Sequence, residues 1–266
     1  MIKLIATDLD GTLLNDKGEI DKKLKSLLNV LKSKNIKFVP TSGRLYSTLC
    51  RNFKDYGSDL IIVAINGAVV QYNNNGKVIY ENPIDREICF ESVKALIDLN
   101  MDFEIYITCK NMNYLLRENK ELIHKFAISD ADMSFIENYY EINEDIFKIG
   151  IFKTSGFTKE EVDRIKIATG NRFEYEVSGN VWLDITNKDV NKGNAIKILQ
   201  NIFDIKKEET LVFGDYYNDI SMFKRAYYSY AMGNAPHDVK AKARFVALDN
   251  NNNGVIKVIE KVAGED

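Results

Sequence analysis

The sequence predicts an α/β protein, in which a core built on a parallel sheet is interrupted by an inserted α+β domain. Short apolar runs alternate with helical patterns over residues 1–80, the same alternation returns from Leu211 onward, and the stretch between them mixes helical patterns with period-two strands. Strands that alternate with helices pair in parallel, because each helix carries the chain back across the sheet. We therefore expect two domains in 266 residues, a core of residues 1–82 and 188–266 and an inserted domain of residues 83–187.

The first part of the core is expected to alternate strand and helix. Four leucines at positions 24, 27, 28 and 31 are spaced as one face of a helix over residues 21–34. Apolar runs at 3–7, 36–39 and 60–65 predict three strands of a βαβαβ unit. The asparagine-glycine turn at 73–76 then joins two strand-like runs, 68–72 and 78–80, into a hairpin.

The inserted domain and the second part of the core follow from the same periodicities. Within the insertion we expect helices at 87–99 and 159–168 and strands at 147–152 and 181–185. After it we expect helices at 194–203, 219–225 and 254–262 and strands at 211–213, 228–231 and 245–248. The two segments on either side of the insertion, residues 1–82 and 188–266, thus supply strands and helices to a single core.

Composition excludes several classes of function. Thirty-six basic and 39 acidic residues give a formal charge of −3, which offers no electrostatic footprint for nucleic acid or anionic lipid. The longest aliphatic run, 60–65, is far shorter than the roughly 20 residues of a membrane span. We therefore expect a soluble, cytoplasmic protein without nucleic-acid or membrane partners, and a monomer or a weak dimer.

Cysteine and histidine usage narrows the chemistry. Three cysteines without CxxC spacing support neither a disulfide framework nor a zinc site, so we expect them to be reduced and buried. Only His124 and His237 are present, which excludes a three-histidine metal site, and we expect both to be structural. The chemistry of this chain is expected to depend on carboxylates.

The first candidate motif is Asp8-Leu9-Asp10-Gly11-Thr12, directly after the first predicted strand. Ligands of open α/β sheets bind at the carboxyl ends of the strands, so two carboxylates at alternate positions there would face one crevice. The alternative is a turn with solvated acids. A calcium EF-loop is excluded, because its glycine stands at the sixth position and Gly11 is the fourth here.

Two further motifs lie at expected helix starts. Thr41-Ser42-Gly43-Arg44 follows the second strand, where a hydroxyl and free amides form either an anion site or an ordinary N-cap. Lys192-Gly193 begins the helix over 194–203. A cation there opposes the helix dipole unless an anion lies between them, and the alternative is an exposed lysine.

The fourth motif, Gly214 to Asp219, again follows a strand and offers Asp215, Asn218 and Asp219. By itself it would also fit a turn followed by a helix cap. The four motifs together bring four acids, one hydroxyl and one lysine to the same rim of the sheet. That coincidence favours a functional site over four unrelated turns.

In this order the motifs resemble those of the haloacid dehalogenase superfamily, and within it the Cof-type phosphatases that carry a large cap (subfamily IIB-like). The resemblance covers the whole chain and rests on DLDGT at 8–12, TSGR at 41–44, NGA at 66–68, the lysine of VNKG at 192, GDYYNDISM at 214–222 and AMGNAP at 231–236. It implies a Rossmann-like parallel-sheet core. Because 150 residues separate Ser42 from Lys192, it also implies that the inserted domain is the cap that determines substrate specificity.

The resemblance assigns catalytic roles to the carboxylates. Asp8 is implied to be the nucleophile of a phospho-aspartyl intermediate, which suits covalent catalysis by a carboxylate. Asp10 is implied to protonate the leaving oxygen and then to activate water. Mg²⁺ is implied to bind the Asp8 carboxylate, the backbone carbonyl of Asp10 and Asp215, an all-oxygen set that suits a hard cation.

The other polar residues of the motifs are implied to hold or support the phosphoryl group. Its oxygens would be held by the side chains of Ser42, Lys192 and Asn218 and by the backbone amides of Leu9 and Gly43. Thr12 would orient Asp10, and Asp219 would pair with Lys192 or with a metal-bound water. Arg44 would either reach the substrate or lie exposed on a helix.

The expected function is a Mg²⁺-dependent phosphomonoester hydrolase that acts on small phosphorylated metabolites such as sugar phosphates. A phosphomutase of the same fold is an alternative, and release of free phosphate separates the two. A non-catalytic module that binds a phosphorylated ligand is disfavoured, because Asp8, Asp10 and Lys192 are all present. Tyr216 and Tyr217 replace the small or polar residues common in the family, and they would either line the entrance or pack outside it.

Overall fold

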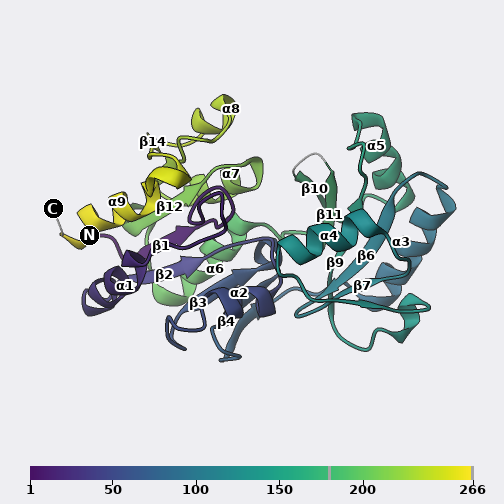
Figure 1. Ribbon diagram of the computed structural model, residues 1–266, viewed down its shortest axis with the longest axis horizontal. Helices are drawn as coiled ribbons and strands as arrows, with labels where there is room; N and C mark the ends of the chain where they lie inside the picture. Colours follow the sequence, from purple (N-terminus) through teal and green to yellow (C-terminus); the bar gives the residue numbers. More distant parts are fainter. Residues whose placement is uncertain (179–180, 265–266) are drawn as a thin grey trace. The chain divides into compact units, whose positions relative to one another are not determined.

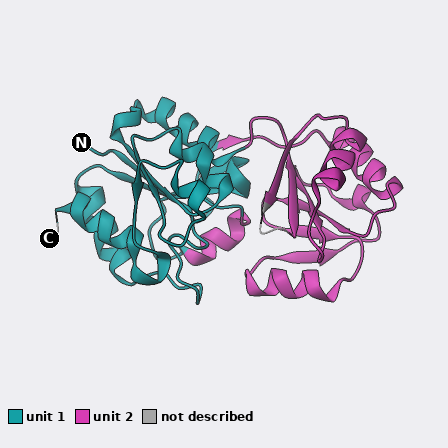
Figure 2. Ribbon diagram, turned by 90° about the horizontal axis from the view of Figure 1, so that it is seen from above, with its two compact units in different colours: residues 1–43, 53–79, 191–266 teal, residues 44–52, 80–190 magenta. Residues whose placement is uncertain are grey.

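The computed structural model describes residues 1–178 and 181–264, and it divides into two compact units (Figures 1 and 2). The first unit contains Met1–Gly43, Phe53–Ile79 and Asn191–Asp266, and the second contains Arg44–Asn52 and Tyr80–Val190. The expected domains also took in residues 179–180 and 265–266, which lie outside the described residues. Residues 44–52, which the sequence placed in the core, group with the second unit instead.

The first unit is built on a parallel sheet with the strand order β14-β13-β12-β1-β2 (Figure 1). Its strands are β1 (Leu4–Thr7), β2 (Lys37–Pro40), β12 (Thr210–Gly214), β13 (Tyr228–Ala231) and β14 (Phe245–Val246). Thr7 at the end of β1 pairs with Pro40 on one side and with Phe213 on the other. The residues that follow these three strands therefore lie at one edge of the sheet, and the expected parallel core is confirmed.

A second, smaller sheet has the order β3-β4-β5 and contains β3 (Ile61–Ala64), β4 (Val69–Tyr72) and β5 (Val78–Glu81). The first unit's segment ends at Ile79, within β5. Residues 60–65 were expected to be the third parallel strand, and the strand found there, β3, does run parallel to the segment that follows β2. A turn over residues 65–67 reverses the chain directly after β3, which therefore pairs antiparallel with β4. One parallel bridge, between Thr41 and Val63, connects β3 to the segment that follows β2.

The first unit also contains five helices within its described residues. They are α1 (Lys23–Ser33), α6 (Lys192–Phe203), α7 (Ile220–Phe223), α8 (His237–Lys240) and α9 (Gly254–Ala263), with short 3₁₀ turns η1 (Ile65–Gly67), η3 (Lys207–Glu209), η4 (Tyr217–Asp219) and η5 (Asn250–Asn252). Helix α1 buries Leu24, Leu27 and Leu31 as expected. The predicted helix over 219–225 is shorter, because a 3₁₀ turn precedes the four residues of α7.

The second unit has a mixed sheet with the order β10-β11-β9-β6-β7-β8. Its strands are β6 (Glu104–Cys109), β7 (Asn113–Leu115), β8 (Met133–Phe135), β9 (Ile146–Phe152), β10 (Glu174–Ser178) and β11 (Trp182–Thr186). Its helices are α2 (Tyr46–Asn52), α3 (Arg86–Asp98), α4 (Lys120–Ile128) and α5 (Lys159–Ala168), with one 3₁₀ turn, η2 (Tyr139–Glu141). All seven residues of β9 are buried, so this strand lies in the core of the unit.

Helix α2 belongs to the second unit because polar contacts attach it there. The Arg51 guanidinium pairs with Asp130 at 2.8 Å and with Asp132 at 2.7 Å. The Ser47 hydroxyl donates to Asp132 Oδ2 at 2.8 Å, and the Thr48 hydroxyl donates to the Asp130 carbonyl oxygen at 3.0 Å. Across the described part of the chain, no helix combines the length and the apolar character needed to cross a bilayer.

Candidate active site

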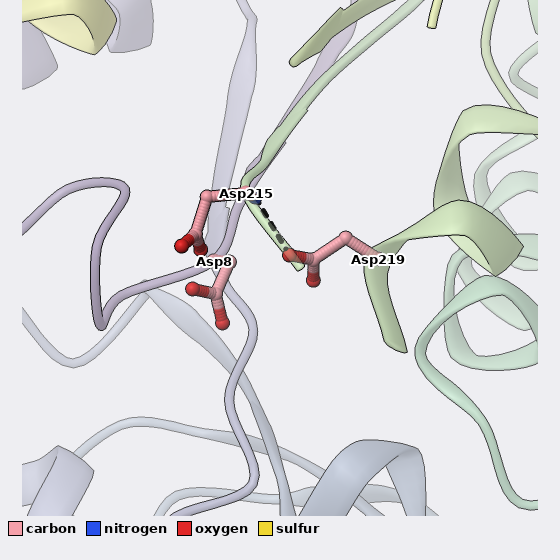
Figure 3. Close-up of side chains that lie close together, drawn as sticks. All are labelled: Asp8, Asp215 and Asp219. Carbon is pink, nitrogen blue, oxygen red and sulfur yellow. Dashed lines mark hydrogen bonds between the residues drawn. The ribbon is translucent and has the colours of Figure 1, made fainter. Parts of the chain in front are cut away.

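Three aspartates of the first unit converge at the carboxyl edge of its parallel sheet (Figure 3). Asp8 follows β1, Asp215 follows the neighbouring strand β12, and Asp219 ends the turn η4. One carboxylate oxygen from each lies within 4.8 Å of the others. The strand order brings the first two together, and the backbone N–H of Asp8 donates to the Phe213 carbonyl oxygen at 3.1 Å.

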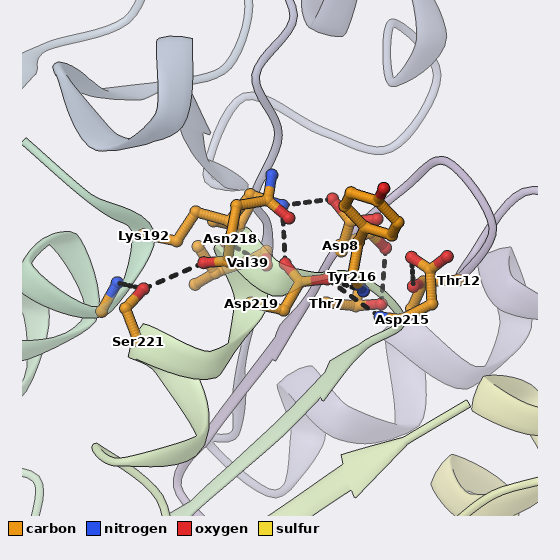
Figure 4. Close-up of polar contacts among 12 residues, drawn as sticks. Thr7, Asp8, Thr12, Val39, Lys192, Asp215, Tyr216, Asn218, Asp219 and Ser221 are labelled. Atoms are coloured by element: carbon orange, nitrogen blue, oxygen red, sulfur yellow. Dashed lines mark hydrogen bonds and ion pairs between the residues drawn. The ribbon is translucent and has the colours of Figure 1, made fainter. Parts of the chain in front are cut away.

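Lys192, the first residue of α6, lies inside this cluster (Figure 4). Its Nζ donates to Asp8 Oδ1 at 2.5 Å and to Asp219 Oδ1 at 2.7 Å. Only 1% of the residue is exposed. The alternative of an exposed lysine is therefore excluded by the structure.

Asp219 organises the loop after β12. Its second oxygen, Oδ2, accepts hydrogen bonds from the backbone N–H groups of Asp215 at 2.9 Å and Tyr216 at 3.1 Å. Its first oxygen accepts from Lys192. Since both oxygens are engaged by donors of the chain, Asp219 is better placed to shape the loop than to bind a metal ion.

The charges of the cluster do not balance. Three carboxylates face one ammonium group, which leaves two excess negative charges if all groups are ionised. Burial raises the pKa of Asp8 well above its ordinary range, against the pull of Lys192, and the charges of Asp219 and Asp215 raise it further. Burial and the Asp219 charge raise the pKa of Asp215 to about 6.

Burial has the opposite effect on the pKa of the ammonium group. Burial by itself would lower the pKa of Lys192, but Asp219 and Asp8 outweigh it and raise that pKa above its ordinary value. Lys192 therefore keeps its charge, and this one ammonium group faces three carboxylates. A hard divalent cation with oxygen ligands would relieve that excess, so the residues present fit Mg²⁺.

Two other residues of the first motif, Thr12 and Asp10, lie near the cluster. The Thr12 hydroxyl donates to Asp215 Oδ1 at 3.0 Å (Figure 4), whereas the sequence analysis expected it to orient Asp10. A hydroxyl can donate one hydrogen bond, and that of Thr12 is donated to the Asp215 carboxylate. Asp10 has an exposed side chain, and its backbone bridges to Leu14.

The expected phosphate-binding residues of the first unit come from the same strand ends. Ser42, 2% exposed, donates its backbone N–H to the Val63 carbonyl oxygen at 2.9 Å. Leu9 is fully buried. Gly43 follows Ser42 and is the last residue of the first unit's segment Met1–Gly43. Asn218 lies in η4 beside Asp219, and Arg44 begins the segment 44–52 of the second unit.

Some polar residues of the site were missed by the sequence analysis. The Ser221 hydroxyl donates to the Asn218 carbonyl oxygen at 3.0 Å and accepts from the Gly193 N–H at 3.0 Å, so it connects the η4 loop to the start of α6 (Figure 4). Asn234 Nδ2 donates to the Gly11 carbonyl oxygen at 2.8 Å. Ser221 lies in the motif at 214–222 and Asn234 in the motif at 231–236. Their membership of these motifs was the signal by which the sequence could have identified them.

The two tyrosines of the η4 loop pack against each other, with ring centroids 5.0 Å apart. The Tyr217 hydroxyl donates to Asp238 Oδ1 of α8 at 3.2 Å, and 47% of Tyr217 is exposed. Tyr217 is therefore turned toward α8. This contact agrees with the alternative in which the tyrosine packs outside the entrance of the site. Tyr216 contributes its backbone N–H to Asp219.

Comparison with known proteins finds relatives along the full chain. The model of the haloacid dehalogenase-like hydrolases matches residues 5–259. The chain is 30% identical to the 5-amino-6-(5-phospho-D-ribitylamino)uracil phosphatase YbjI of Escherichia coli, covering 98% of this chain and 96% of that protein. It is 27% identical to the phosphatase YwpJ of Bacillus subtilis, covering 97% and 99%.

Solved structures agree with these relatives. The crystal structure of SMU.1108c from Streptococcus mutans superposes with a TM-score of 0.88 at 30% identity, covering 99% of this chain and 100% of that one. The crystal structure of TM0651 from Thermotoga maritima superposes with a TM-score of 0.82 at 30% identity, covering 98% and 97%.

Proposed function

Because this chain belongs to the haloacid dehalogenase-like hydrolases and is a phosphatase of that family, we propose that it hydrolyses small phosphorylated metabolites through a phospho-aspartyl intermediate on Asp8. The observation that carries this proposal is the convergence of Asp8, Asp215 and Asp219 on the buried Lys192. A site of this kind combines a carboxylate nucleophile with a fixed positive charge for the phosphoryl oxygens.

The reaction is proposed to proceed in two displacements. A carboxylate oxygen of Asp8 attacks phosphorus, the bond to the leaving oxygen breaks, and Asp10 gives that oxygen a proton. Asp10 then takes a proton from a water molecule, whose oxygen attacks phosphorus and releases free phosphate and the Asp8 carboxylate. The exposed position of Asp10 supports this exchange with water and with a leaving group.

The phosphoryl oxygens are proposed to be held by Ser42, Asn218 and Lys192 and by the backbone amides of Leu9 and Gly43. The Lys192 ammonium already lies 2.5 Å from Asp8, so it would be adjacent to an oxygen transferred to that carboxylate. Mg²⁺ is proposed to be held by Asp8, Asp215 and the backbone carbonyl of Asp10. When bound, it would offset the charge that otherwise repels a phosphate dianion from this cluster.

The second unit, residues 44–52 and 80–190, is proposed to be the cap that selects the substrate, and the insertion expected at 83–187 makes up most of it. One relative is named as a phosphatase of 5-amino-6-(5-phospho-D-ribitylamino)uracil, so this compound and common sugar phosphates make up the first substrate panel. The three cysteines are free thiols, which fits a reducing, cytoplasmic location. Chemistry on a small molecule requires no protein partner.

The first test is phosphate release by the purified protein from p-nitrophenyl phosphate and from the substrate panel. We expect release with Mg²⁺ and its loss in excess chelator, because the excess carboxylate charge must be neutralised before a dianion binds. Full activity in excess chelator would contradict the metal assignment. Transfer of the phosphoryl group to a second position of the sugar, without free phosphate, would instead indicate a mutase.

Calorimetry of Mg²⁺ binding gives a second readout that does not depend on turnover. Asp215→Asn should weaken binding at least about tenfold, because one charged oxygen ligand is removed. The control is Asp238→Asn, an exposed aspartate of the same unit outside the cluster. Equal binding by both variants would remove Asp215 from the proposed ligands.

A further inference from the structure

Three successive residues directly after β3 have left-handed backbone torsions. The φ angle is 50° at Ile65, 53° at Asn66 and 100° at Gly67. This conformation is ordinary for glycine and uncommon for asparagine, and it is an outlier for a β-branched residue such as isoleucine. All three residues are buried. A strained backbone persists only where surrounding contacts hold it, and such segments concentrate at functional sites.

The segment 65–67 contacts the loop that carries Ser42. The backbone N–H of Asn66 donates to the Ser42 carbonyl oxygen at 3.0 Å, while the Ser42 N–H donates to Val63. A Cβ atom added to Gly43 would lie 3.0 Å from Asn66 Oδ1, so the Asn66 side chain lies directly against the Gly43 backbone. Ser42 is therefore held through both of its peptide groups by residues at the end of β3.

The same segment contacts the start of α6. A Cβ atom added to Gly67 would lie 2.6 Å from the Asn191 carbonyl oxygen and 3.2 Å from Ala195 Cβ. Asn191 is the N-cap of α6, and its side chain accepts a hydrogen bond from the backbone of that helix. Lys192 is the next residue. The segment thus lies between two of the groups to which the phosphoryl oxygens are assigned, Ser42 and Lys192.

We propose that Asn66 is a positioning residue, which sets the spacing of Ser42 and Lys192 around the transferring phosphoryl group through the left-handed segment 65–67. The inference rests on the proposed function of the same site. Asn66 acts through the Ser42 backbone and, with Gly67, through the N-cap of α6, and it does not touch the reacting atoms. Because misplacement by about 1 Å costs on the order of 10²-fold in rate, relaxing this segment should slow catalysis without unfolding the protein.

The first test compares Asn66→Ala with Asn66→Gly. Alanine disfavours the left-handed conformation, whereas glycine adopts it without steric cost. We expect Asn66→Ala to lower kcat for p-nitrophenyl phosphate by about 10–100-fold with a smaller change in KM. We expect Asn66→Gly to be at least about threefold more active than Asn66→Ala, because it keeps the backbone conformation and gives up only the side-chain contact with Gly43. Equal losses in the two variants would overturn the proposal, since the backbone conformation would then not matter.

A second pair of variants protects the test against a simple folding defect. Gly67→Ala should displace the start of α6 and lower kcat by a similar factor. Its matched control is Gly57→Ala, because Gly57 also has a positive φ of 94° and an added Cβ would lie 2.8 Å from Asp59 Oδ1, but it precedes β3 at the opposite end of the strand. If both glycine variants lost stability and activity to the same extent, the segment would be structural only and the proposal would fail.

Binding of inorganic orthovanadate, which imitates the transferring phosphoryl group, separates this proposal from the proposed function. Calorimetry in the presence of Mg²⁺ should show about tenfold weaker binding to Asn66→Ala than to the unaltered protein. If the unaltered protein hydrolysed none of the esters but this difference in binding were found, the proposed function would fail and the positioning role would stand. Equal binding by the two proteins, or no binding by the unaltered protein, would overturn the positioning role.

Discussion

Each unit of this protein buries one lysine beside aspartate, and the two arrangements differ in charge balance. In the second unit, Lys148 Nζ lies 3.0 Å from Asp184 Oδ1, and both residues are less than 10% exposed. In the first unit, Lys192 is buried with Asp8 and Asp219 and with Asp215 nearby. One lysine meets a single carboxylate, and the other meets a cluster of three.

The pKa values follow this difference. Burial would lower the pKa of Lys148, but Asp184 and the Tyr106 hydroxyl raise it above its ordinary value. In this pair one ammonium group faces one carboxylate, and burial raises the pKa of the Tyr106 phenol beside them. In the Lys192 cluster burial raises the pKa values of Asp8 and Asp215 as well, and the charges of neighbouring carboxylates raise them further. Uncompensated charge, rather than burial of charge, distinguishes the candidate catalytic site from a structural ion pair.

The largest effect that would sharpen this comparison is expected from Asp8→Asn. It should reduce turnover of every phosphate ester by at least about 10⁴-fold, because the nucleophile is lost. The free energy of unfolding in metal-free buffer should stay the same or rise, since Lys192 keeps Asp219 and one repelling carboxylate is removed. Steady-state kinetics and chemical denaturation test the two halves. A loss of stability as large as that of a broken buried pair would break the comparison.

Lys192→Met should have the next largest effect. It removes the one ammonium group found in this cluster within the described residues, so the rate should fall by about 10²–10³, the range for losing one charge-stabilising donor. In contrast to Asp8→Asn, the free energy of unfolding should also fall in metal-free buffer, because three carboxylates would remain without a counter-charge. A rate within threefold of the unaltered protein would remove Lys192 from the catalytic groups.

The smallest effect on the chemistry, but a large effect on stability, is expected from Asp184→Asn. It leaves the buried Lys148 without its carboxylate, which should cost about 3–5 kcal/mol of unfolding free energy. The control replaces both partners, Lys148→Met with Asp184→Leu, and should recover most of this loss because no buried charge remains. Denaturant unfolding monitored at Trp182, which lies in the same unit, measures both variants. An unchanged midpoint for Asp184→Asn would mean that the pair is not structural.

Local patterns were sufficient to predict much of the fold and of the site. The leucine face of α1 and the apolar runs of β1, β2 and β12 predicted the parallel core, because burial of a repeating pattern is a local property of the sequence. Asp8 and Asp215 were expected to meet since they follow strands at the same edge. The buried state of Lys192 was an alternative that only the packing of α6 could decide.

What could not be predicted depends on contacts between distant residues. The antiparallel pairing of β3 with β4 was not predicted, because it depends on three left-handed residues, 65–67, of which two are not glycine. The hydroxyl of Thr12 donates to Asp215, which lies 203 residues further along the chain. Helix α2 is attached to Asp130 and Asp132, which are about 80 residues further along the chain and carry no periodic signal.

The attachment of α2 has a consequence for protein engineering. The second unit is made of two segments, 44–52 and 80–190, and the chain passes between the units after residues 43, 52, 79 and 190. A chimaera that exchanges only the long segment with that of a relative would retain an α2 whose Arg51 and Ser47 face foreign residues in place of Asp130 and Asp132. A transplant of the second unit between relatives should therefore carry both segments, or at least restore this group of polar contacts in the recipient.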